Sequence, residues 1–128
     1  MKIINIDDSP FKHVNICNVL KNCGLGVVDI EWATNLEKGI EMICEQEESY
    51  DLIITDMWYP EKEGGENVES GAALIKKAIE EKWNIPIILV STVPYVYSEI
   101  LGTVRYGDEL FWEDELMKLV KRQFKRST

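Results

Sequence analysis

The sequence predicts an α/β protein built on a doubly wound parallel sheet, and three observations carry this prediction. Short runs rich in Ile and Val alternate with longer stretches of helical period along the chain. The run at 85–91 (IPIILVS) is the most apolar, as in a central parallel strand covered on both faces. The 128 residues suffice for one domain with a proper core. We therefore expect a single domain over 1–128, with no second domain.

The N-terminal half reads as strands and helices in turn. Ser9 and Pro10 supply an N-cap and a first-turn proline for a helix over 11–22, and Gly24 ends that helix. Asn35 caps a second helix, whose apolar residues recur at helical spacing. Strands are expected over 2–6, 27–33 and 51–55.

The C-terminal half begins with a polar segment, 57–70, whose Pro60 and Gly64-Gly65 indicate a loop. Helices are then expected over 71–82, 94–101 and 112–125, and strands over 85–91 and 103–106. Strict β-α alternation with right-handed crossovers predicts a parallel sheet with helices on both faces. The expected strand order is 2-1-3-4-5, the flavodoxin-like arrangement.

Composition excludes several classes of protein. The net charge is −9, with 23 acidic against 14 basic residues, which argues against a nucleic-acid surface. The basic residues crowded into 118–126 are typical of a helix C-terminus. No apolar run reaches the ~20 residues of a membrane span, and the first residues do not form a signal peptide. With three unpaired cysteines, these features predict a cytoplasmic protein without a membrane segment.

The chemistry-bearing residues follow the strands. Asp7 and Asp8 come after the first strand, Asp56 after the third, and Ser91 ends the fourth. Because function gathers at the carboxyl ends of parallel strands, three carboxylates and a hydroxyl should meet there. Their mutual repulsion requires a cation, and oxygen ligands favour a hard divalent ion such as Mg²⁺. A carboxylate in this setting can also attack phosphorus and form an acyl phosphate.

These features, in this order, resemble the receiver domains of response regulators. The resemblance rests on IDD after the first strand, DLIITD closing the third, Pro60 four residues beyond Asp56, and IPIILVS ending in a hydroxyl. It covers essentially the whole chain. It implies that Asp8 binds Mg²⁺ directly and Asp7 largely through water, and that Asp56 is both a metal ligand and the phosphoacceptor.

The same resemblance implies roles for three further positions. The backbone carbonyl of Trp58 would complete the metal site, and Ser91 would bind a phosphoryl oxygen. Tyr106 stands on the expected fifth strand, where the family carries an aromatic switch residue. Ordinary packing at the edge of the sheet is the alternative for Tyr106. Trp58 and Tyr59, beside the acceptor, form either a lid or a hydrophobic cover.

Two features depart from the family pattern. The lysine that usually follows the fifth strand has no clear match, and counting back from the last helix places Gly107 or Glu109 near its position. Arg105 is the nearest cation, and its side chain either reaches the phosphoryl group or points to solvent. A guanidinium group does not simply replace an ammonium group in a tight phosphoryl site. If Gly71 begins the third helix, the loop 57–70 carries roughly six extra residues, either functional or a mobile insertion.

The expected function is phosphorylation-dependent signalling. A histidine kinase or a phosphotransfer protein would donate the phosphoryl group, and the domain would act as a catalyst only in its own phosphorylation and dephosphorylation. The change would pass from Ser91 to the face made by the fourth helix, fifth strand and fifth helix. An output protein, or a second copy of the chain in a homodimer, would read it there.

Two alternatives remain. A pseudo-receiver would use the same fold as a protein-binding module without phosphorylation, and the missing lysine favours it. A small phosphatase with an aspartate nucleophile is the second. That class needs its two acids two residues apart on the first strand, whereas Asp7 and Asp8 are adjacent.

Overall fold

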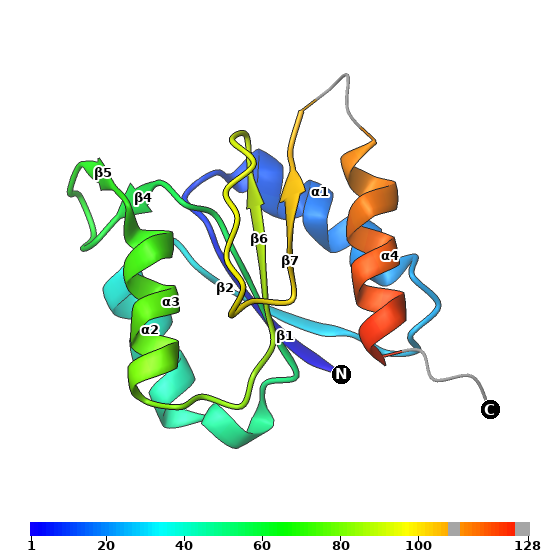
Figure 1. The fold of residues 1–128 in the computed structure, drawn as a ribbon, viewed down its shortest axis with the longest axis horizontal. Coiled ribbons are helices and arrows are strands. Elements are labelled where there is room, and N and C mark those ends of the chain that lie inside the picture. Colours follow the sequence, from blue (N-terminus) through cyan, green and yellow to red (C-terminus); the bar gives the residue numbers. More distant parts are fainter. Residues whose placement is uncertain (108–110, 125–128) are drawn as a thin grey trace.

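The computed structural model describes residues 1–107 and 111–124 and contains a five-stranded sheet with helices on both faces (Figure 1). The strand order is β2-β1-β3-β6-β7, and every neighbouring pair is parallel. The predicted α/β fold with flavodoxin-like strand order is therefore confirmed. The strands are β1 (Lys2–Ile6), β2 (Asp29–Ala33), β3 (Leu52–Thr55), β6 (Ile87–Ser91) and β7 (Gly102–Arg105).

Four α-helices cover this sheet. Helices α1 and α4 pack on one face, and α2 and α3 on the other (Figure 1). The two predicted N-caps are confirmed, since the side chains of Ser9 and Asn35 accept hydrogen bonds from the backbone three residues on. The helices are α1 (Pro10–Lys21), α2 (Leu36–Glu45), α3 (Ser70–Glu80) and α4 (Trp112–Phe124), with a short 3₁₀ turn at Glu47–Ser49.

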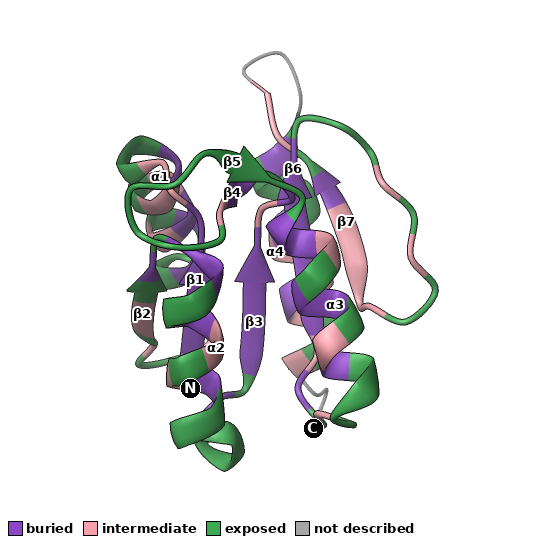
Figure 2. Ribbon diagram, turned by 90° about the vertical axis from the view of Figure 1, so that its left-hand side faces the viewer, coloured by how far each residue is buried: buried purple, intermediate pink, exposed green. Residues whose placement is uncertain are grey.

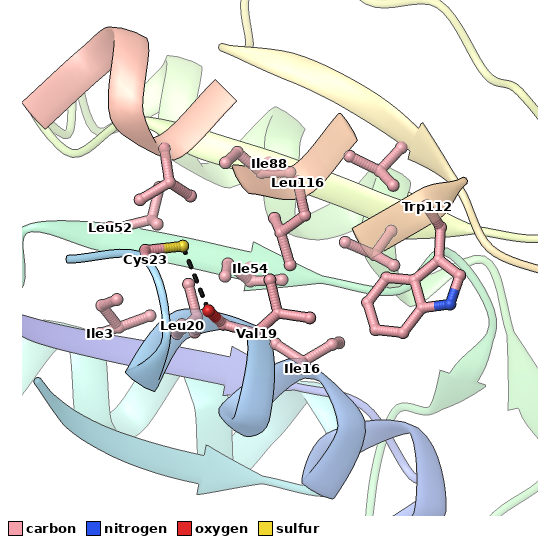
Figure 3. Close-up of a cluster of buried hydrophobic side chains, with 13 residues drawn as sticks. Ile3, Ile16, Val19, Leu20, Cys23, Leu52, Ile54, Ile88, Trp112 and Leu116 are labelled. Atoms are coloured by element: carbon pink, nitrogen blue, oxygen red, sulfur yellow. Dashed lines mark hydrogen bonds between the residues drawn. The ribbon is translucent and has the colours of Figure 1, made fainter. Parts of the chain in front are cut away.

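The three central strands carry the core. Every residue of β3 and β6 is buried, as is most of β1 (Figure 2). One hydrophobic cluster lies between the sheet and helices α1 and α4, where Leu20, Ile54 and Leu116 meet (Figure 3). A second cluster lies under α2 and α3. Burial on both faces explains why β6 is apolar throughout.

The helix predicted over 94–101 is wrong, because the segment between β6 and β7 is irregular. Pro94 stands at its start, and the β-branched and aromatic residues that follow have low helix propensity. Val96 is 93% exposed, and Tyr97, Ile100 and Leu101 pack only partly against the core. With so little apolar surface to bury, a helix of this length is not stable in water. The face expected to carry the signal therefore lacks its fourth helix.

The segment 57–70 was also predicted incompletely. It contains a small antiparallel hairpin formed by β4 (Tyr59–Pro60) and β5 (Asn67–Val68). Tyr59 is fully buried, although residues 61–66 that follow it closely are polar or glycine. The insertion is thus attached to the core through an aromatic side chain.

Several boundaries move by one or two residues. Helix α1 begins at Pro10, β2 begins at Asp29, and the fifth strand of the sheet ends at Arg105. Lys125, predicted as the end of the last helix, and Glu109 lie outside the described residues. No helix within 1–107 and 111–124 is long and apolar enough to cross a membrane.

Gly71 fixes the start of α3 against the end of β3. Its amide donates a hydrogen bond to the Met57 carbonyl oxygen at 2.9 Å. A Cβ atom at this position would lie 2.3 Å from the Asp56 carbonyl oxygen and 2.7 Å from the Met57 Cα atom. Because both obstacles are backbone, the helix could not approach with any larger residue.

We expect Gly71→Ala to lower the free energy of unfolding by about 1–3 kcal/mol, the usual cost of overpacking. Gly39→Ala is the matched control. Its Cβ would meet only the flexible side chain of Ile6, and it sits within α2, where Ala is favoured over Gly. Urea unfolding of both variants measures the difference. Equal midpoints would contradict the close approach at Gly71.

Candidate metal centre

Three carboxylates meet at the carboxyl edge of the sheet. Asp7 and Asp8 follow β1, and Asp56 follows β3, its immediate neighbour. The Asp56 amide donates to the Ile6 carbonyl oxygen at 3.0 Å, which aligns the two strand ends. One ligand oxygen from each of the three carboxylates lies within 4.8 Å of the others. The predicted convergence of Asp7, Asp8 and Asp56 is therefore present.

Asp7 is the most buried member of this acidic cluster, with 1% of its side chain exposed. Its Oδ1 accepts a hydrogen bond from the Ser9 amide at 3.0 Å, whereas its Oδ2 accepts none of good geometry from the described residues. Burial raises the pKa of the Asp7 carboxyl; the Lys12 ammonium opposes that rise and the charge of Asp56 adds to it. The Lys12 ammonium, 2.9 Å from Oδ2, relieves part of this cost, and a metal ion would relieve more of it.

Asp56 is more accessible, with 18% of its side chain exposed. Its Oδ1 accepts a hydrogen bond from the Met57 amide at 2.8 Å. No described residue donates a hydrogen bond to its Oδ2. One oxygen is thus held in place, and the other remains available to a ligand or an electrophile.

Lys12 completes the site, and the sequence reasoning missed it. The Lys12 Nζ atom lies 2.9 Å from Asp7 Oδ2 and 3.2 Å from Asp56 Oδ1. It also donates a hydrogen bond of 2.6 Å to the Val90 carbonyl oxygen. A signal was present in the sequence, because Lys12 precedes Ile16 by four residues and Val19 by seven, on the buried stripe of α1. A lysine in such a stripe requires a partner for its charge.

The acidic cluster fits a divalent cation. Three carboxylates face one ammonium, so an excess of negative charge remains. Oxygen ligands, an Asp7 Oδ2 atom without a hydrogen bond, and an open Asp56 Oδ2 atom suit Mg²⁺, which binds through one or two carboxylates and retains several waters.

The fold has close structural relatives. A response regulator receiver domain protein from Clostridium thermocellum superimposes with a TM-score of 0.71 at 18% identity, over 98% of this chain and 94% of that one. A response regulator receiver protein from Pseudoalteromonas atlantica gives a TM-score of 0.72 at 12% identity, over 98% of each chain. The receiver domain of the hybrid histidine kinase CckA gives 0.67 at 20% identity, over 97% of this chain and 99% of that one.

This chain has the receiver-domain fold. No protein-family model matches the sequence, and no curated protein matches it. The likeness therefore lies in the three-dimensional arrangement, at a sequence identity too low to carry a function with it.

Within the receiver-domain fold, Ser91 and Arg105 are neighbours on adjacent strands. Ser91 is buried at the end of β6 and pairs in register with Arg105 on β7. The Ser91 hydroxyl accepts only a long hydrogen bond of 3.5 Å, from the Val93 amide. Arg105 is exposed and forms no salt bridge with any described carboxylate. Its predicted contact with a phosphoryl group stays a prediction.

Tyr106 directly follows β7 and is not part of the strand as predicted. Its amide donates to the Ser91 carbonyl oxygen at 2.8 Å, and its hydroxyl accepts from the Asn15 side chain at 3.3 Å. Its ring packs against Trp112, with the ring centroids 4.8 Å apart. Tyr106 thus directly follows the fifth strand of the sheet, ahead of Gly107 and Glu109, the two positions that counting back from the last helix gives for the missing lysine.

Trp58 follows Asp56 by two residues in the loop after β3. Its side chain is 43% exposed, and its indole nitrogen donates to the Tyr95 hydroxyl at 2.8 Å. This bond links the loop after β3 to the irregular segment after β6. The role of the Trp58 backbone carbonyl as a metal ligand stays a prediction.

Asp8→Asn should weaken Mg²⁺ binding by about tenfold or more, because it removes a charged ligand oxygen from a site that holds the ion through few protein ligands. Asp29→Asn makes the same chemical change at an exposed position on β2 and should leave the affinity unchanged. Chemical shifts followed during a Mg²⁺ titration measure both variants. Wild-type affinity in Asp8→Asn would show that the acidic cluster is not the metal site.

Proposed function

We propose that this chain is a phosphoacceptor receiver of a two-component signalling system, phosphorylated on Asp56. The observation that carries the proposal is the position of Asp56. It directly follows the central strand β3 of a receiver-domain fold, with oxygens of Asp7 and Asp8 within 4.8 Å. The side chain is partly exposed, so a phosphoryl donor can reach it.

Asp56 is the nucleophile in this proposal. Its Oδ1 is held by the Met57 amide, which leaves Oδ2 to form the new bond to phosphorus. The bond from phosphorus to an imidazole nitrogen of a histidine kinase or phosphotransfer protein breaks. The electron pair stays on that nitrogen, and because the other ring nitrogen of the donor carries a proton, the departing group is neutral imidazole. The domain acts as a catalyst only for this transfer and for the later hydrolysis.

Asp8, Asp56 and the Trp58 carbonyl would hold Mg²⁺, with Asp7 acting largely through water. When bound, the ion neutralises charge on the transferring phosphoryl group. Ser91 would bind a phosphoryl oxygen, since its hydroxyl has only a weak partner in the described structure.

The signal would leave through the side of the sheet near Ser91. The segment 92–101, between β6 and β7, contains no helix. The surface that a partner reads would therefore consist of this irregular segment, β7 and α4. An output protein, or a second copy of the chain, would bind there in response to phosphorylation. We place this exchange in the cytoplasm; Cys17, Cys23 and Cys44 are all free thiols, as a reducing compartment favours.

Labelling by acetyl phosphate tests the proposal. Intact-mass measurement should show one added phosphoryl group in the presence of Mg²⁺ and none in EDTA. The adduct should be released by hydroxylamine, which cleaves acyl phosphates. The absence of any Mg²⁺-dependent label would refute the proposal.

A pseudo-receiver is the second candidate, and one observation favours it. The Lys12 ammonium already pairs with Asp56, so a cation is present without metal. In that case the fold would bind a partner without being phosphorylated. Failure to label, together with failure of Mg²⁺ to shift the resonances of Asp8 and Asp56, would select this candidate.

A further inference from the structure

Lys12 is held at the centre of the acidic cluster by three oxygen atoms from three strand ends. Its Nζ atom lies 2.9 Å from Asp7 Oδ2, 3.2 Å from Asp56 Oδ1 and 2.6 Å from the Val90 carbonyl oxygen. The ammonium thus donates a hydrogen bond to the Val90 carbonyl and forms ion pairs with two carboxylates. Only 8% of the side chain is exposed. A cation this buried is retained only where its charge is compensated.

The Lys12 ammonium lies over the face of the Tyr106 ring. The Lys12 Nζ atom lies 5.2 Å from the centre of the Tyr106 ring, within the range of a cation–π contact. Tyr106 is itself fixed by its hydrogen bonds to Ser91 and Asn15. Tyr106, which follows the fifth strand of the sheet, therefore contributes an aromatic face to the site, and Lys12 of α1 contributes the cation.

We propose that Lys12 is the phosphoryl-binding cation of this site, delivered from α1 instead of from the end of the fifth strand. The inference rests on the proposed function of Asp56. Because Nζ lies 3.2 Å from one oxygen of Asp56, a phosphoryl group on that carboxylate brings its own oxygens within hydrogen-bonding reach of the ammonium. The ion pair with Asp56 then gives way to a charge-assisted hydrogen bond with the phosphoryl group.

The position of Lys12 implies that it competes with Mg²⁺ before phosphorylation and acts together with Mg²⁺ afterwards. Before phosphorylation, the ammonium and the metal ion compete for Asp7 and Asp56, because either one neutralises them. After phosphorylation, about two negative charges are added at Asp56, so the two cations act together. Arg105 offers no such arrangement, since its side chain is exposed and has no described carboxylate partner.

The test compares two ligands in one set of variants. Beryllofluoride binds an aspartate oxygen as a phosphoryl group would. One NMR titration adds beryllofluoride at saturating Mg²⁺, and a second adds Mg²⁺ alone. Lys12→Met keeps the length of the side chain and removes its charge. We expect it to weaken beryllofluoride binding by about tenfold or more, the usual loss for a charge-assisted hydrogen bond. Mg²⁺ alone should bind at least as tightly as in the wild type.

Two variants serve as controls. Lys21→Met removes an exposed charge from the same helix and should change neither titration. Arg105→Ala tests the competing cation and should also leave both titrations unchanged. If Lys12→Met does not fold without metal, Lys12→Gln carries the same comparison, because its amide can still donate toward Val90.

The outcomes separate the two proposals. A wild-type protein that binds no beryllofluoride refutes the acceptor function itself. A wild-type response that Lys12→Met preserves in full refutes the role of Lys12. An equal loss of Mg²⁺ and beryllofluoride affinity in Lys12→Met also refutes it, because the lysine would then only hold the carboxylates in place. A loss confined to Arg105→Ala would assign the role to the arginine instead.

Discussion

Asp56→Asn should abolish labelling by acetyl phosphate, a loss of at least about a hundredfold, because an amide does not provide the oxygen nucleophile that forms an acyl phosphate. The substitution should leave the local structure intact. The amide oxygen of Asn can still accept the hydrogen bond from the Met57 amide that Asp56 Oδ1 accepts at 2.8 Å. Intact-mass measurement after incubation with Mg²⁺ and acetyl phosphate gives the result.

Asp51→Asn is the matched control. Asp51 stands at the opposite end of β3, is exposed, and accepts a hydrogen bond from the Lys2 amide that Asn can also accept. Its variant should be labelled like the wild type. Labelling that survives in Asp56→Asn would mean that another carboxylate accepts the phosphoryl group, and the assignment of Asp56 would be wrong.

The acidic cluster was predictable because topology alone determines it. Once the order of strands is known, Asp7, Asp8 and Asp56 must meet at the carboxyl edge of two adjacent strands. The meeting of these carboxylates does not depend on side-chain conformation or on the structure of the loops. Ser91 and Arg105 were placed side by side for the same reason.

Lys12 was missed because the helix was read from its apolar residues alone. A lysine in the first turn of a helix is ordinarily solvated, and its burial here depends on carboxylates that come from elsewhere in the chain. The lysine was expected after the fifth strand, near Gly107 or Glu109. The signal that was overlooked is the place of Lys12 on the buried stripe of α1.

The two incorrect segments have a common cause. The helix over 94–101 was predicted from its place in the β-α alternation, although the residues themselves favour extended structure. The hairpin within 57–70 was overlooked because its strands are two residues long, below the length at which alternation is visible. In both segments, local sequence pattern alone did not identify the conformation.

Tyr59 joins the hairpin to the core. Its hydroxyl lies 2.9 Å from the Thr55 hydroxyl, which in turn donates to the Asp56 carbonyl oxygen at 2.8 Å. Because Thr55 gives its one hydroxyl proton to Asp56, the Tyr59 hydroxyl is the donor to Thr55. The Ser70 hydroxyl donates to the Tyr59 carbonyl oxygen at 2.6 Å, which ties the hairpin to the start of α3.

The hairpin is also tied to α2. The Glu37 amide, in the first turn of that helix, donates to the Glu61 carbonyl oxygen at 2.9 Å. Such amides have no partner within the helix, so the hairpin satisfies one of them. An insertion with these contacts on α2, β3 and α3 is part of the folded unit and holds the backbone around Asp56.

Tyr59→Ala should therefore lower the free energy of unfolding by about 3–5 kcal/mol, as expected when a buried aromatic side chain is truncated and leaves a cavity. Tyr59→Phe keeps the ring and removes only the hydrogen bond to Thr55, so it should cost about 1 kcal/mol. Urea unfolding of the two variants beside the wild type separates packing from hydrogen bonding. A loss below 1 kcal/mol in Tyr59→Ala would mean that the hairpin is a loosely attached insertion, and that the backbone around Asp56 is held by β3 and α3 alone.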